Sequence, residues 1–130
     1  MPIRGPTSWS VSVKYVVLIY SNPTTWAEMP AAERDRVLGV HNKMIKELKE
    51  SGELLRVDGL ADSRATKTIR ARDGVPVVTD GPFGEAKEFL AGVWAIDVES
   101  LDRALEVAAP VAEYDTVEVR ELMDLSGMEM

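Results

Sequence analysis

Proton-transfer chemistry in this chain centres on two side chains, His41 and Asp80. His41 is the single histidine, and imidazole is the side chain whose ordinary change of charge falls near neutral pH. A carboxylate within hydrogen-bond reach would fix the ring tautomer and stabilise the charged ring, so that His41 could act as a general acid or base. The sequence therefore predicts a His41–Asp80 catalytic pair, provided that the fold brings the two together.

Asp80 opens the stretch DGPFGEAKE, which lies between two strand-like runs. Gly81 and Gly84 allow backbone angles that are closed to other residues, and the proline between them fixes one φ angle, which together predict a rigid, shaped loop. The alternative is a tight connection followed by a solvated Glu-Lys-Glu tail, and composition alone favours this simpler interpretation. If the loop is a site, its candidate substrate-binding side chains are Phe83 and Lys87.

His41 lies within a predicted helix that begins at Pro30 and ends at Gly52. The spacing puts the histidine on the apolar stripe of that helix, so it is expected to point inward. A lone histidine on an apolar face is more often a core residue with a satisfied ring N–H, and the pattern by itself favours that alternative. The stripe consists of Val37, Met44, Ile45 and Leu48.

Arg120 is the third candidate substrate-binding residue. In the last predicted strand, Val117 and Val119 face one way while Glu118 and Arg120 face the other. Arg120 could hold a carboxylate or phenolate ligand, or it could form an ion pair with Glu118. The ion pair is the slightly favoured interpretation.

The predicted elements follow one another as a strand, a helix, several short strands, a longer strand, a second helix and a final strand. Residues 53–59 and 65–72 are interpreted as a strand pair, Asp73-Gly74 as a hairpin turn, and Ser100 as the cap of a second helix with an apolar side at Leu101, Ala104, Leu105 and Ala108. This order predicts an α+β fold with helices on one face of an antiparallel sheet. The other face would still carry apolar residues and would need a partner, so we expect a homodimer with a small-molecule cavity between sheet and loops. The remaining strands are predicted at residues 14–20, which are expected to be covered on both faces, and at residues 75–79, 89–98 and 115–123.

Composition narrows the class of protein. The 130 residues, 45% of them apolar, suit one domain at residues 13–124, with an N-terminal extension at 1–12 and a C-terminal tail at 125–130. A net charge of −7 argues against nucleic-acid or anionic-membrane partners, and no apolar run is long enough to span a bilayer. The absence of cysteine excludes disulfides and thiol chemistry and, without a recognisable signal peptide, suggests a cytoplasmic protein. One histidine and scattered carboxylates give no metal site, and nothing indicates a cofactor.

The stretch VVTDGPFGEAKEFLAGVWAIDVESLDRALEVAA, followed by VEVR, resembles the YCII-related family in its DGPF-domain branch. The likeness runs from about residue 14 to residue 123. It implies a ferredoxin-like βαββαβ unit with an antiparallel sheet, pairing into a dimeric α/β barrel. It also implies a histidine near this part of the first helix, which His41 matches.

The resemblance implies two classes of function. Relatives with a comparable His/Asp pair are linked to cofactor-independent lyase or dehalogenase chemistry on aromatic or small acids, which carries over to His41 and Asp80. Other relatives occur beside extracytoplasmic-function sigma factors, which implies a non-catalytic accessory or regulatory protein. The substrate and the reaction stay open on the sequence alone.

Overall fold

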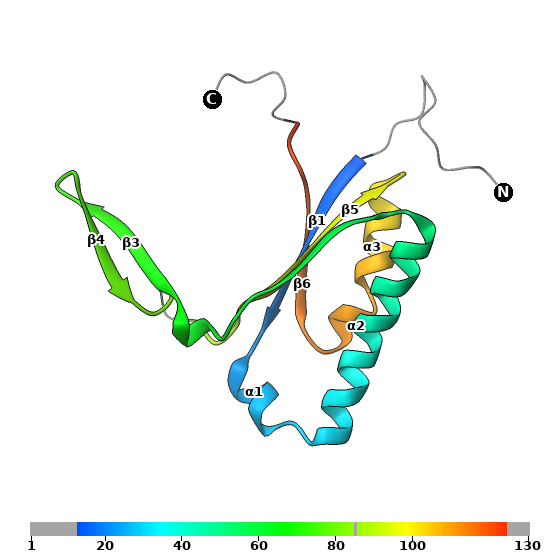
Figure 1. Ribbon diagram of the computed structural model, residues 1–130, viewed down its shortest axis with the longest axis horizontal. Coiled ribbons are helices and arrows are strands. Elements are labelled where there is room, and N and C mark those ends of the chain that lie inside the picture. The colour runs from blue at the N-terminus through cyan, green and yellow to red at the C-terminus, as the bar shows by residue number, and fades with distance from the viewer. Residues whose placement is uncertain (1–12, 85, 125–130) are drawn as a thin grey trace.

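The computed structural model describes residues 13–84 and 86–124 (Figure 1). The predicted extension at residues 1–12 and the predicted tail at 125–130 lie outside these ranges. The strands are β1 (Val13–Ser21), β2 (Leu54–Gly59), β3 (Lys67–Arg72), β4 (Val75–Asp80), β5 (Phe89–Val98) and β6 (Thr116–Glu121). The helices are α1 (Pro23–Glu28), α2 (Ala31–Ser51) and α3 (Leu101–Ala108), with short 3₁₀ turns η1 (Ser63–Ala65) and η2 (Val111–Glu113).

The main sheet has four antiparallel strands in the order β2-β5-β1-β6. Strands β3 and β4 form a separate two-stranded hairpin, which projects away from the main sheet (Figure 1). With the hairpin and α1 set aside, the elements follow one another as β1-α2-β2-β5-α3-β6. This arrangement is consistent with a ferredoxin-like fold, as the family resemblance implied, and its α+β class is the one that the order of elements predicted.

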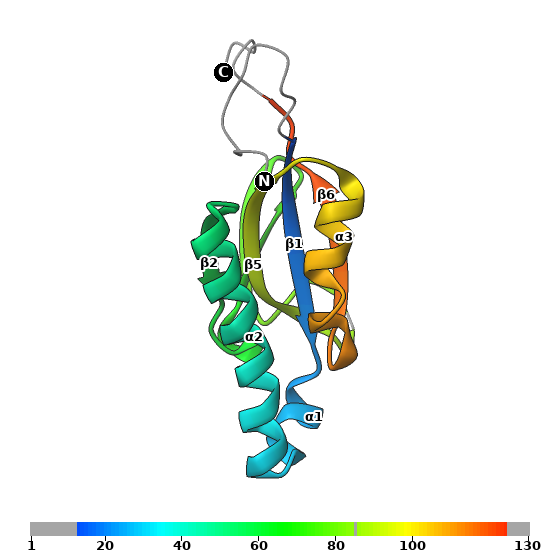
Figure 2. The same ribbon diagram turned by 90° about the vertical axis from the view of Figure 1, so that its right-hand side faces the viewer.

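The core lies between the main sheet and the two longer helices, which cover the same face of the sheet (Figure 2). Alternate residues of β1 and β5 are buried there, including Val17 and Trp94, and they pack against residues of the helices such as Leu48 and Val107. The intervening β1 residues Val16, Leu18 and Tyr20 are only half-buried. The prediction that residues 14–20 are covered on both faces is therefore wrong for a single chain, because the helices shield one face only.

Local capping signals set the helix ends. Gly52 ends α2 in the left-handed conformation at φ 80°, and the N–H of Glu53 donates to the carbonyl of Leu48 at 3.0 Å, as predicted for a glycine-terminated helix. The hydroxyl of Ser100 accepts from the Arg103 N–H at 3.1 Å, which confirms the predicted cap of α3. Helix α1 was not predicted: the Asn22 side chain accepts from the Thr24 N–H at 2.9 Å and caps this helix.

One packing prediction was wrong and another was only half right. Strand β2 pairs with β5 rather than with β3, so chain neighbours are not sheet neighbours here. On α3, Ala104 and Ala108 are buried as predicted, but Leu101 and Leu105 are about half exposed, at 49% and 48%, and Val107 is buried in their place. At Gly92, where β5 lies against β2, a Cβ would lie 3.4 Å from the backbone oxygen of Asp58, which is the near limit of ordinary van der Waals contact. The Asp73-Gly74 turn joins β3 to β4 as predicted, with φ angles of 49° and 80°.

A buried ion pair joins the start of β2 to α3. Glu53 accepts hydrogen bonds from Arg103 Nε at 2.9 Å and from Arg103 Nη2 at 2.8 Å. These hydrogen bonds raise the pKa of Arg103 above its usual range, against a smaller opposing effect of burial. The bidentate geometry satisfies the only buried charged side chain in the described core, and it fixes the end of α2 relative to α3.

Within residues 13–84 and 86–124, no helix is both long enough and apolar enough to cross a bilayer.

Candidate functional site

A cavity of about 830 Å³ lies beside the ends of β2 and β5, where α1, α2 and η1 meet the main sheet. Its wall is largely apolar and includes two indole rings, those of Trp26 and Trp94. Its size is within the range of small-molecule sites. The polar side chains among its lining residues include Glu28, His41, Asp62, Arg64 and Asp115.

His41 reaches this cavity from the middle of α2, as its inward-facing stripe predicted. Its Nε2 lies 3.7 Å from Oδ2 of Asp115, and its ring meets Trp94 edge-on at 5.8 Å between centroids. The side chains of His41 and Asp115 are only 22% and 15% exposed. Nε2 itself is buried and has no hydrogen-bond partner in the described part of the chain. A buried ring nitrogen without a partner is costly, so its position beside a carboxylate requires an explanation other than packing.

Asp80 lies elsewhere in the chain, at the end of β4. Its side chain is 87% exposed and forms an ion pair with Lys67, the residue opposite it in the hairpin. The following loop is shaped as predicted, because Gly81 and Gly84 adopt φ angles of 91° and 76°. Within one chain, then, the carboxylate beside His41 is that of Asp115, and a His41–Asp80 pair would need the hairpin of a second chain or a movement of the hairpin.

The three predicted substrate-binding residues also lie outside the lining of the cavity. Phe83 is 70% exposed, and its ring lies under the guanidinium of Arg70 at 4.9 Å. Lys87 is exposed in the loop before β5. Arg120 is exposed on β6, and no ion pair joins it to Glu118 among the described residues. Glu118 instead hydrogen-bonds Tyr20 on the neighbouring strand, which raises the pKa of the Tyr20 hydroxyl.

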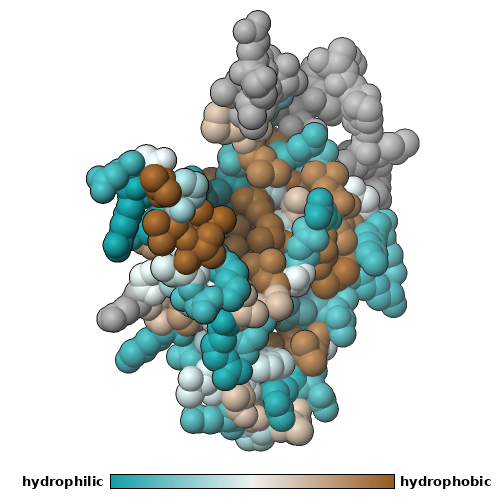
Figure 3. All heavy atoms as spheres, turned by 60° about the vertical axis from the view of Figure 1, so that its left-hand side comes forward, coloured by the Kyte–Doolittle hydropathy of each residue, from teal (hydrophilic) through white to brown (hydrophobic). Residues whose placement is uncertain are grey.

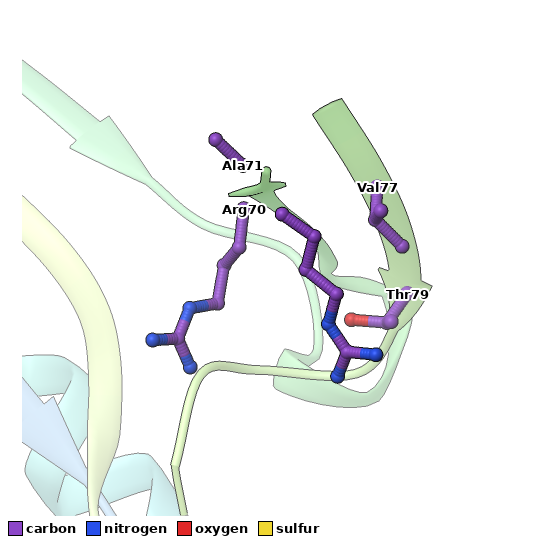
Figure 4. A pocket seen from close by; sticks show the side chains of 5 residues that line it. Arg70, Ala71, Val77 and Thr79 are labelled. Atoms are coloured by element: carbon purple, nitrogen blue, oxygen red, sulfur yellow. The ribbon is translucent and has the colours of Figure 1, made fainter. Parts of the chain in front are cut away.

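The β3–β4 hairpin has two different faces, because its side chains alternate along each strand. One face carries the apolar side chains of Ile69, Pro76 and Val78. The other carries arginines and a hydroxyl around a hollow of about 200 Å³, which Figure 4 shows at close range. The hollow is lined by Arg70, Ala71, Arg72, Val77 and Thr79, and it shares no lining residue with the His41 cavity.

No three side chains of His, Cys, Asp or Glu gather in a group that could hold a metal ion, as far as the described residues go.

Residues 13–126 match the YCII-related domain family, which is nearly the whole chain. The chain belongs to the YCII-related domain family. It is also 36% identical over 94 residues to an uncharacterized protein of Rhizobium meliloti (strain 1021), an alignment that covers 72% of this chain and 76% of that protein. Neither the family description nor the name of this relative states a reaction, so the function of the YCII-related domain is inferred from the cavity.

Sequence reasoning missed Asp115 and the two indoles of the cavity wall. Asp115 follows the η2 turn and immediately precedes β6, and its own N–H bonds the carbonyl of Val111. A usable signal was topological: β6 runs antiparallel to β1, so its first residues must lie near the end of β1, where the chain turns towards α2. Trp26 was missed because α1, which carries it, was not predicted.

Proposed function

We propose that this YCII-related domain binds a small organic molecule in the His41 cavity and moves a proton on it, with His41 as the acid–base group and Asp115 as its partner. The proposal rests on one observation: a buried imidazole nitrogen without a hydrogen bond lies 3.7 Å from a partly buried carboxylate, in the wall of a cavity. Catalytic hydrogen bonds are often long without substrate and shorten when it binds.

We assign the roles of the two groups from the approach of Nε2 to Asp115. When Nε2–H donates to Asp115, Nδ1 keeps its lone pair and can accept a proton from the bound substrate. Asp115 then stabilises the imidazolium that forms, and His41 later returns the proton to a leaving group or to solvent. A positioned acid–base group of this kind contributes roughly 10²–10⁴-fold to a rate. This proton transfer suits reactions of the lyase or dehalogenase type. The electron pair that the proton leaves behind on the substrate forms a double bond as the leaving group departs with its own bonding pair.

We further propose that two copies associate through the sheet face that lacks helices, as in a dimeric α/β barrel. Half-buried apolar side chains of β1 and β5, among them Leu18 and Val93, occupy that face. Figure 3 shows apolar side chains on this side of the molecule, both over the main sheet and over the hairpin. Apolar side chains gathered on one face support association, because soluble monomers rarely leave large apolar patches in contact with water.

The test is a fragment screen followed by amide chemical shifts in the NMR spectrum of the full-length protein. We expect binders to shift the resonances of residues around His41 and Trp94, and we expect His41→Leu and Asp115→Asn to abolish turnover of any substrate found. Asp80→Asn distinguishes the two carboxylates: loss of turnover in this variant alone would favour Asp80 as the partner. Binding that survives every substitution, without turnover, would support a non-catalytic binding or regulatory role. Shifts confined to the hairpin would overturn the proposal.

A further inference from the structure

We propose that the His41 cavity selects an organic amine, a cation with an apolar or aromatic body, over the small or aromatic acid that the sequence suggested. The inference rests on the proposed function, since it assumes that a ligand occupies this cavity. The charged side chains of the cavity wall support it, because each can be assigned a partner of opposite charge or none.

Two of the carboxylates near the cavity are already neutralised. Asp62 accepts from Arg64 Nε at 3.1 Å and from Arg64 Nη2 at 2.8 Å, so the arginine of the wall is paired with a carboxylate of the same wall. Asp58, another lining residue, pairs with Arg56 at 2.6 Å, and the strand register puts its side chain on the sheet face of Val93 and not on that of Trp94. Each of these two arginines is therefore already matched by a carboxylate, so neither adds a net positive charge to the wall.

Two carboxylates of the wall have no lysine or arginine at ion-pair distance in the described part of the chain, those of Glu28 and Asp115. Arg64 is the only lysine or arginine among the described lining residues, and it forms an ion pair with Asp62. Asp115 is only 15% exposed, and its side chain receives no hydrogen bond from the described part of the chain. A carboxylate accepts hydrogen bonds at both oxygens and donates none, so a partly buried one needs donors.

An ammonium group supplies those donors. Oδ2 of Asp115 faces His41, which leaves Oδ1 for a ligand N–H, and the two contacts are compatible because they use different oxygens. The indoles of Trp26 and Trp94 line the same cavity, and an indole face attracts a cation. The net charge of −7 adds a long-range attraction for cations. A carboxylate ligand would instead be repelled by Asp115 and Glu28 at short range.

The experiment compares three probes that share a benzene ring and differ in charge: benzylamine, benzyl alcohol and benzoate. Their dissociation constants for the full-length protein are measured by NMR titration at pH 7 and fixed ionic strength. We expect benzylamine to bind at least about tenfold more tightly than benzoate, with the alcohol between them. Raising the salt concentration should weaken the binding of benzylamine and leave the affinity for benzyl alcohol unchanged.

Substitutions of the two wall carboxylates then test whether they cause the preference for benzylamine. Asp115→Asn should reduce the preference for benzylamine over benzoate by about tenfold while changing the affinity for benzyl alcohol by less than about twofold. Glu28→Gln provides a second variant, with a smaller reduction, should Asp115→Asn fold poorly. Asp35→Asn is the matched control, because it removes one charge from an exposed position of α2 outside the cavity.

The outcomes separate the two proposals. If benzoate binds as tightly as benzylamine, the charge inference is wrong while the cavity remains a small-molecule site. If the preference for the amine is equal in Asp115→Asn, Glu28→Gln and Asp35→Asn, it arises from the overall charge of the chain and not from the wall, and the inference is again wrong. If none of the three probes shifts a resonance of the cavity, the proposed function falls with it.

Discussion

Nε2 of His41 lies 3.7 Å from Oδ2 of Asp115, although the two residues belong to elements far apart in the chain. One comes from the middle of α2 and the other from the turn before β6. The gap is slightly too long for a hydrogen bond, and Nε2 has no other partner in the described part of the chain. An imidazole held in this way is poorly placed for stability and well placed to change its hydrogen bonding when a ligand arrives.

His41→Leu is therefore expected to leave the free energy of unfolding unchanged or to raise it by up to about 2 kcal/mol, because it removes an unpartnered buried polar atom at similar volume. Chemical denaturation measures this. Val37→Ala, at a buried position one turn earlier in α2, is the control and should lose about 1–3 kcal/mol. A loss for His41→Leu as large as that of the control would mean that the histidine is a satisfied core residue, the alternative that its spacing favoured.

Glu53→Gln is expected to lower the free energy of unfolding by about 1–3 kcal/mol. Breaking a buried ion pair usually costs more, but the Arg103 side chain is 29% exposed, so water compensates part of the loss. Glu106→Gln is a matched control, because Glu106 pairs with the same arginine at 71% exposure and should change stability by less than about 1 kcal/mol. Urea denaturation followed by circular dichroism compares the two variants. Equal losses in the free energy of unfolding would show that the buried pair with Glu53 contributes no more to stability than the exposed pair with Glu106.

The sequence predicted those parts of the fold that depend on residues close together in the chain. The ends of α2 follow from Pro30 and Gly52, and the turn at Asp73-Gly74 follows from its φ preferences, because each signal acts within a few residues. Strand pairing depends on distant partners, and here adjacency in sequence misled: the turn at η1 sends β3 into a separate hairpin, so β2 pairs with β5. For the site, the inward face of His41 was predictable from helical spacing, whereas its neighbour Asp115 was not, because no local pattern marks a carboxylate that only the sheet order brings near.

Leu18→Glu is expected to convert a dimer into a monomer of 14.3 kDa, because it puts a charge in the middle of the helix-free face. Light scattering across a concentration series measures the mass. Leu105→Glu is the control: it adds the same charge at a leucine that is 48% exposed on α3 and should leave the dimer intact. A mass of 14.3 kDa for the unsubstituted protein at every concentration would contradict the proposed association.

Arg64→Gln is expected to raise the pKa of the Asp62 carboxyl. In the unsubstituted protein this pKa is lowered from 3.8 to about 2, mainly by the hydrogen bond from the Arg64 side chain and to a lesser extent by the one from its backbone N–H. The backbone bond survives the substitution, so the return should be partial. The folded chain favours the ionised carboxylate, so the contribution of this group to stability is complete above pH 3.8 and is lost as the pH falls towards 2. Carboxyl carbon shifts in an NMR titration measure the midpoint, and Arg56→Gln, which removes the arginine beside Asp58 instead, should leave it unchanged. A midpoint near 3.8 in the unsubstituted protein would mean that Arg64 is free in solution, and the wall of the cavity would then hold a cation able to receive an acid.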